Sequence, residues 1–146
     1  MHDATSGDAL ARGAEVVCHN DRAPWNLVLD RDAPIAFIDF DDAAPGARLD
    51  DLGYLLWTFL RLGDEVASDV QAQRMAALCG AYGLKSGEGL IDAILAQQAR
   101  VGTWRQERAR TASEDDVRRF CAARVVEIQS DIAWVLRHRA TLAAAV

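Results

Sequence analysis

The spacing of apolar residues changes once along this chain, near Asp39, and this change constrains the fold more than any other feature. Before it, the apolar residues fall in three short runs, at 15–18, 26–29 and 34–38. Runs of this length are typical of short strands, and the polar turn 30–33 between the last two predicts a β-hairpin. After it the spacing becomes helical, so we expect strands first and helices afterwards.

Amphipathic helices are predicted throughout the second part of the chain. Their apolar positions fall within residues 52–60, 66–82, 90–101 and 117–135. Asp50 is placed to cap the start of the first helix, while Gly63 and Gly83 are placed to end the first two. Ser113, followed by acidic residues, indicates the start of the last helix. The predicted class is α+β and mostly helical, with a small β-hairpin and about four helices in a single domain, residues 1–146.

Composition limits the classes of function. The chain is 51% hydrophobic and 26% charged with both signs interspersed, which is typical of a globular domain; only residues 1–12 are predicted to be flexible. A net charge of -6 argues against binding to nucleic acid, and the apolar runs are too short to cross a bilayer. The cysteines are odd in number and no signal-like segment follows Met1, so we expect a cytoplasmic protein without disulfides.

Polar residues gather in the loop between the first apolar run and the hairpin. His19, Asp21 and Asn26 stand in the order His-x-Asp-x-x-x-x-Asn, and the second hairpin strand ends at Asp39. Because the hairpin returns the chain toward the loop, we expect these polar groups to converge. Magnesium takes oxygen ligands such as the amide of Asn26 and the carboxylate of Asp39, and a carboxylate beside it can accept a hydroxyl proton.

Several of these polar residues also have a plain structural interpretation. A histidine such as His19 can organise a loop through its ring nitrogens, and we prefer this role to a chemical one. Asp and Asn often stabilise turns, so Asp42 is interpreted as a solvated turn charge, whereas Asp41 is either a further ligand or a second such charge. The arginines between Arg100 and Arg119 are most simply a solvated face, with contact to an acidic partner as the alternative.

Residues 16–62 resemble the catalytic core of the aminoglycoside phosphotransferase and choline kinase-like family. The family pattern is His-Gly-Asp-x-x-Pro-x-Asn, a hairpin, Ile-Asp-Phe or Ile-Asp-Trp, and then Asp-Leu at a helix start. The residues that match in order are His19, Asp21, Pro24, Asn26, Ile38, Asp39, Asp51 and Leu52. The chain departs from the pattern at Asn20, where the family has glycine, and at 46–48, where Gly-Ala-Arg replaces Gly-Asp-Pro.

The resemblance implies a kinase-like C-terminal lobe that phosphorylates a hydroxyl of a small molecule with ATP and magnesium. The roles that it implies are catalytic base for Asp21, magnesium ligand for Asn26 and Asp39, and support of the catalytic loop for His19 and Asp51. Trp25 lies inside the loop and is a candidate cofactor-binding residue.

Kinases of this kind also carry an N-terminal lobe with a lysine that pairs with the nucleotide phosphates. The one lysine of this chain, Lys85, lies far downstream of the loop, so the sequence predicts that the nucleotide lobe is absent. One hypothesis is a kinase core whose N-lobe is supplied by a separate chain or is missing from this sequence. The other is a non-catalytic remnant that binds a ligand or partner, as in resistance or immunity, and associates with a second copy through uncovered apolar surface. The acceptor stays open, because kinases for different hydroxyls share this core.

Overall fold

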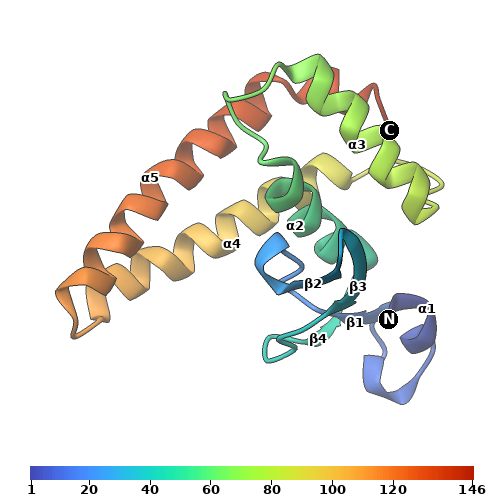
Figure 1. Cartoon of the computed structure of the whole chain (residues 1–146), viewed down its shortest axis with the longest axis horizontal. Coiled ribbons are helices and arrows are strands. Elements are labelled where there is room, and N and C mark those ends of the chain that lie inside the picture. Colours follow the sequence, from blue (N-terminus) through green and yellow to red (C-terminus); the bar gives the residue numbers. More distant parts are fainter.

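The computed structural model describes the whole chain, residues 1–146, and Figure 1 shows strands in its first third and long helices in the remainder. The elements in chain order are α1 (His2–Thr5), β1 (Val16–Cys18), β2 (Leu27–Asp30), β3 (Ala33–Phe37), β4 (Ala44–Gly46), α2 (Arg48–Leu60), α3 (Ser68–Tyr82), α4 (Leu90–Thr111), α5 (Asp115–Arg137) and α6 (Arg139–Ala143), with short 3-10 helices at Ala9–Ala11 and Pro24–Asn26. The predicted class, α+β and mostly helical, is confirmed.

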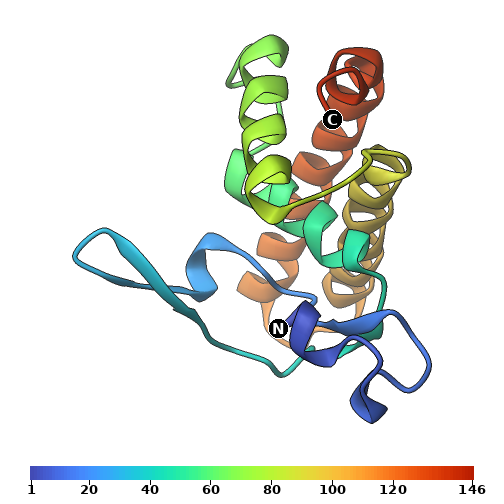
Figure 2. The ribbon, with the colours of Figure 1, turned by 90° about the vertical axis from the view of Figure 1, so that its right-hand side faces the viewer.

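Two separate antiparallel strand pairs frame the loop that follows β1. The β2–β3 hairpin is the predicted one, with Leu27 opposite Phe37, and it projects away from the helices (Figure 2). The second pair joins β1 to β4, with Val16 opposite Gly46. Strand β4 was not predicted, because its Ala-Pro-Gly sequence has low strand propensity and depends on pairing with β1. Together the two pairs return the chain from the hairpin to the start of α2.

Helix α2 lies at the centre of the molecule and packs against α4. A Cβ atom on Gly53 would lie 2.9 Å from backbone atoms of Ala93 and Ile94, so the glycine allows the two helices to approach closely. The same core extends to α3, α5 and α6. Its fully buried members include Leu56, Leu62, Met75, Leu90, Ile94, Val135 and Leu142. Helix α2, which begins directly after β4, is therefore held in the buried helical core.

The helix ends depart slightly from the sequence expectations. Asp50 does cap α2, but from its third position, where Oδ2 accepts the N–H of Ala47 at 3.0 Å. Helix α2 ends with Arg61 in the left-handed region (φ 51°), ahead of the predicted Gly63, whereas α3 ends at Gly83 as predicted. None of the helices is both long enough and apolar enough to span a membrane.

Candidate functional site

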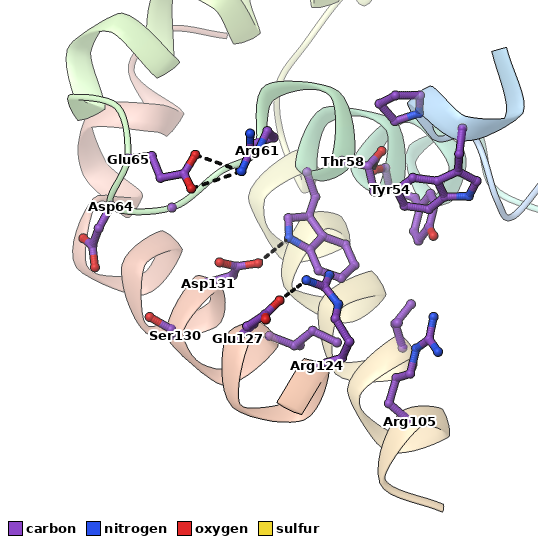
Figure 3. A pocket seen from close by; sticks show the side chains of 16 residues that line it. Tyr54, Thr58, Arg61, Asp64, Glu65, Arg105, Arg124, Glu127, Ser130 and Asp131 are labelled. Carbon is purple, nitrogen blue, oxygen red and sulfur yellow. Dashed lines mark hydrogen bonds and ion pairs between the residues drawn. The ribbon is translucent and has the colours of Figure 1, made fainter. Parts of the chain in front are cut away.

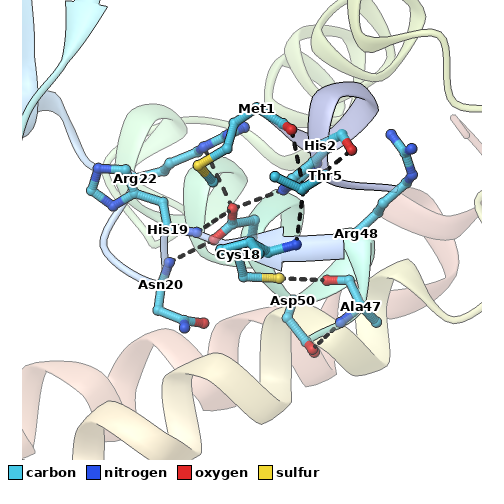
Figure 4. Close-up of polar contacts among 12 residues, drawn as sticks. Met1, His2, Thr5, Cys18, His19, Asn20, Arg22, Ala47, Arg48 and Asp50 are labelled. Atoms are coloured by element: carbon cyan, nitrogen blue, oxygen red, sulfur yellow. Dashed lines mark hydrogen bonds and ion pairs between the residues drawn. The ribbon is translucent and has the colours of Figure 1, made fainter. Parts of the chain in front are cut away.

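Asp51, in the first turn of α2, anchors the loop that follows β1. Its fully buried carboxylate accepts the backbone N–H groups of His19 and Asn20 at 2.8 and 2.7 Å. The ring of His2 donates to it at 2.8 Å, and the guanidinium of Arg22 lies 3.5 Å away (Figure 4). Burial alone would raise the pKa of Asp51, but these hydrogen bonds and the nearby positive charge hold it below its ordinary value. An ionised carboxylate therefore ties the start of the loop to α2.

His19 joins the loop to the end of the hairpin. Its buried ring contacts the carbonyl oxygen of Ile38 through Nε2 at 3.1 Å and accepts the N–H of Asp21 at Nδ1, at 3.3 Å. These two partners together are satisfied by the tautomer that carries its proton on Nε2. The ring centroid lies 4.5 Å from that of Phe40 and 5.9 Å from that of Phe37. Through these contacts His19 connects the loop to the residues that precede and follow Asp39.

The Asp21 carboxylate is held by donors at both oxygens. Asn26 Nδ2 donates to Oδ2 at 2.7 Å and also to the Asp21 carbonyl at 2.9 Å. The hydroxyl of Tyr54, in α2, donates to Oδ1 at 2.7 Å, and the indole of Trp25 approaches Oδ2 at 3.4 Å. An ionised carboxylate only accepts hydrogen bonds, so these donors fix its orientation and leave lone pairs for one further partner.

Asn26 and Asp39 lie at neighbouring positions at the end of the hairpin. The N–H of Ile38, the residue before Asp39, donates to the carbonyl of Asn26 at 3.0 Å. The Asn26 side chain uses only Nδ2 for its hydrogen bonds, which leaves its amide oxygen available to a ligand. The carboxylate of Asp39 is exposed. One amide oxygen and one carboxylate are a donor set that suits magnesium completed by phosphates and water.

The loop contains an asparagine where the family pattern has glycine. Asn20 adopts a left-handed conformation (φ 64°), which asparagine enters more readily than most residues. Its side chain donates to the carbonyl of Asp42 at 2.9 Å, and its own carbonyl accepts the guanidinium of Arg100 from α4 at 3.0 Å. Asparagine at position 20 therefore keeps the turn. Arg100, although it is in α4, bonds the loop and is not part of a wholly solvated face.

A pocket of about 500 Å³ opens beside Asp21, between α2, α4 and α5 (Figure 3). Trp25, Tyr54 and Trp57 contribute aromatic side chains to it. The charged residues that line it are Arg61, Asp64, Glu65, Arg105, Arg124, Glu127 and Asp131. The pocket is thus polar and mixed in charge, with aromatic surface at the end nearest the loop.

One carboxyl in this pocket, that of Asp131, has a shifted pKa. Asp131 accepts the indole N–H of Trp57 at 2.9 Å, and burial raises the pKa of its carboxyl despite that hydrogen bond. Sequence reasoning missed the pocket, because its residues come from three helices and two loops that are far apart in the sequence and follow no short motif. It also missed Tyr54 and Arg100, whose positions fit an ordinary helix face.

A second cluster of potential metal ligands lies behind the loop and is better explained by hydrogen bonding. Ligand atoms of His2, Cys18 and Asp51 lie within 4.8 Å of one another. However, burial and the charge of Asp51 raise the pKa of Cys18 to about 11, so its thiol stays protonated and donates to the carbonyl of Ala47 at 3.1 Å. His2 and the loop already occupy the Asp51 carboxylate.

Comparison with known proteins connects this site to one family. No curated protein and no solved structure matches the chain. The model of the phosphotransferase enzyme family (APH) matches residues 6–90, which is more than half of the chain. The matched segment runs from the N-terminal region through the loop, the hairpin and α2 to the start of α4, and it contains every site residue predicted from the sequence. The chain therefore belongs to the phosphotransferase enzyme family.

Proposed function

We propose that this chain is the catalytic lobe of a small-molecule kinase, which uses ATP and magnesium to phosphorylate a hydroxyl group. The observation that carries the proposal is the Asp21 carboxylate, held by Tyr54 and Asn26 beside a pocket of about 500 Å³. Membership of a phosphotransferase family supports the reaction class.

In this proposal Asp21 accepts or orients the proton of the acceptor hydroxyl. Phosphoryl transfer requires little covalent chemistry from the protein, and an aligned hydroxyl is the main requirement on the acceptor side. The pocket supports this role, because Trp25 and Tyr54 border it and both contact Asp21. Trp25, a cofactor-binding candidate from the sequence, is thus assigned to the acceptor side. The mixed charges of the pocket favour a small polar acceptor.

Asn26 and Asp39 would hold the magnesium ion through the amide oxygen and the carboxylate. A magnesium ion bound there would neutralise charge on the nucleotide phosphates. His19 and Asp51 keep these ligands in register, since one bonds the backbone at Ile38 and the other bonds the start of the loop. The positions of Asn26 and Asp39 therefore depend on hydrogen bonds within the chain.

The hairpin and the residues that follow it are proposed as the docking site of a nucleotide-binding lobe supplied by another chain. Ile35 is 63% exposed and Phe40 is 49% exposed, and Leu29 and Ile38 are also exposed. Exposed apolar side chains on a projecting hairpin and on the residues that follow it favour an interaction surface. Docking of a partner there would cover them and place its phosphate-binding groups next to Asp39.

The test is a transfer assay on the full chain with γ-labelled ATP, magnesium and a panel of sugars, amino sugars and amino alcohols. We expect a labelled product that disappears when EDTA removes magnesium. Asp21→Asn should lower the rate about 100-fold or more, because a general base contributes about that much. Equal rates for the two proteins would overturn the role of Asp21.

Calorimetry with ATP and magnesium provides the second arm of the test. If the chain neither binds nucleotide at millimolar concentration nor transfers phosphate, it is not a kinase on its own. That result would favour the alternative, a non-catalytic module that binds a ligand or partner.

A further inference from the structure

The two oxygens of the Asp21 carboxylate are held by different parts of the molecule. Asn26, which holds Oδ2, belongs to the same loop and moves with it. Tyr54, which holds Oδ1, belongs to the central helix α2 and is separated from Asp21 by 33 positions in the sequence. The Tyr54 hydroxyl is therefore the direct side-chain link between the carboxylate and the helical core.

We propose that Tyr54 is a positioning residue for phosphoryl transfer, whose hydroxyl fixes Asp21 Oδ1 so that the remaining lone pair of this oxygen receives the acceptor hydroxyl from the pocket. The inference rests on the proposed function, because it assigns to Asp21 the role of base. It adds a residue outside the loop motif and specifies the oxygen that reacts.

The surroundings of Tyr54 restrict its ring to one orientation. Its side chain is only 7% exposed, and the ring of Trp57 meets it edge to face with centroids 5.8 Å apart. On another side the guanidinium of Arg100 lies 6.0 Å from its ring centroid while donating to the loop at Asn20. A phenol held in this way offers a fixed donor, which is the requirement for orienting a carboxylate.

The phenol also remains a donor over the whole working range of pH. Burial raises the pKa of Tyr54, and the hydrogen bond and negative charge of Asp21 raise it further. The neighbouring arginines, Arg100 and Arg105, act in the opposite direction but do not reverse the shift. Tyr54 therefore does not exchange a proton with the acceptor, and its role is to orient.

The two oxygens of Asp21 differ in what they can still accept. Oδ2 faces Asn26 Nδ2 and the Trp25 indole, whereas Oδ1 has the Tyr54 hydroxyl as its one partner. Each carboxylate oxygen offers two lone-pair sites, so Oδ1 keeps one free. Tyr54 itself lines the pocket, so the group that fixes Oδ1 also connects the carboxylate to the pocket wall.

The test is a double-mutant cycle in the full chain with Tyr54→Phe, Asp21→Ala and the double variant. With the acceptor identified by the transfer assay, Tyr54→Phe should lower kcat about tenfold, as expected for loss of a hydrogen bond to a charged group, with the acceptor KM changed less than about twofold. In the Asp21→Ala background the same change should have no further effect on the residual rate. Thr111→Val is the matched control, since that hydroxyl bonds only the Glu107 carbonyl at the far end of α4, and it should leave kcat unchanged.

The same variants are compared by urea unfolding without nucleotide, which does not depend on activity. The coupling between Tyr54 and Asp21 should amount to about tenfold in the unfolding equilibrium constant. An active chain in which Tyr54→Phe leaves kcat unchanged, or in which the two losses multiply, overturns the inference and leaves the kinase proposal standing. A coupled pair in a chain that transfers no phosphate overturns the role in transfer together with the proposed function.

Discussion

The two sides of the candidate site differ in how firmly the chain itself holds them. Asp21 accepts hydrogen bonds from Tyr54 in the core helix and from Asn26 in the loop, and its orientation is set before any ligand binds. Asp39 follows the second strand of the hairpin, and its carboxylate is exposed. In the proposed function, this contrast means that the fold preorganises the acceptor side, whereas the nucleotide side would acquire its remaining contacts from magnesium and phosphates.

The largest expected effect comes from removing Asp51, the residue that ties the loop carrying Asp21 to α2. Asp51→Ala takes away a fully buried carboxylate that pairs with Arg22 and His2, and it should cost about 3–5 kcal/mol in the free energy of unfolding. Urea unfolding followed by circular dichroism measures it. Asp50→Ala is the matched control, because it removes one capping hydrogen bond to Ala47 and should cost about 1 kcal/mol. Equal losses for the two variants would show that Asp51 does not anchor the loop.

The same anchor predicts the direction of the pH dependence. The pKa of Asp51 is lower in the folded chain than in the unfolded one, so its stabilising contribution is complete above the unfolded value of about 4. The contribution falls as the pH drops from there through the folded pKa. Denaturant midpoints measured between pH 6 and pH 3 should therefore fall less steeply for Asp51→Asn than for the native chain. Parallel curves would contradict the assignment.

For Asp39, the expected effect is mainly on ligand binding rather than on the stability of the fold. Asp39→Ala should weaken magnesium-dependent nucleotide binding by about tenfold or more, while costing only about 1 kcal/mol in the free energy of unfolding, because alanine is strained in the left-handed backbone at this position (φ 64°). Calorimetry and urea unfolding on the same samples give both quantities. Asp42→Ala, a nearby exposed turn residue, should change neither. A large loss of stability in Asp39→Ala would mean that the hairpin end is as firmly built as Asp21.

The smallest effect is expected for Arg100, which, from α4, bonds the loop that carries Asp21. Arg100→Ala removes one hydrogen bond to the Asn20 carbonyl and should cost about 1 kcal/mol of stability and a few-fold in transfer rate. Arg108→Ala, an exposed position on the same helix, is the control and should have no measurable effect. If both variants behave alike, Arg100 belongs to a solvated face, as the sequence alone had indicated.

The sequence predicts those parts of the fold whose local pattern agrees with their final environment. The hairpin and the four long helices follow from apolar spacing and from Gly83 as a helix end. Strand β4 could not be predicted, because Ala-Pro-Gly becomes a strand only by pairing with β1. The short helix α1 likewise depends on a distant contact, between the buried His2 and Asp51.

The site shows the same division between local and distant information. Asp21, Asn26 and Asp39 could be proposed from the sequence because Asp21 and Asn26 stand in one short motif and Asp39 follows the strand that returns the chain to it. Tyr54 could not, because an aromatic residue at helical spacing is typical of an ordinary core position. Arg100 stands in a run of arginines typical of a solvated surface, and only the packing of α4 against α2 brings it to the loop.

The central claim is that the loop and the hairpin end form one magnesium and nucleotide site, and paramagnetic NMR tests it most directly. Manganese is a hard cation that replaces magnesium at oxygen ligands and broadens the resonances of nearby amides. With ATP present, substoichiometric manganese should broaden the amides of Asn26 and Asp39 strongly and leave that of Gly83, at the end of α3, unaffected. Equal broadening at all of these positions, or broadening of neither Asn26 nor Asp39, would contradict the claim.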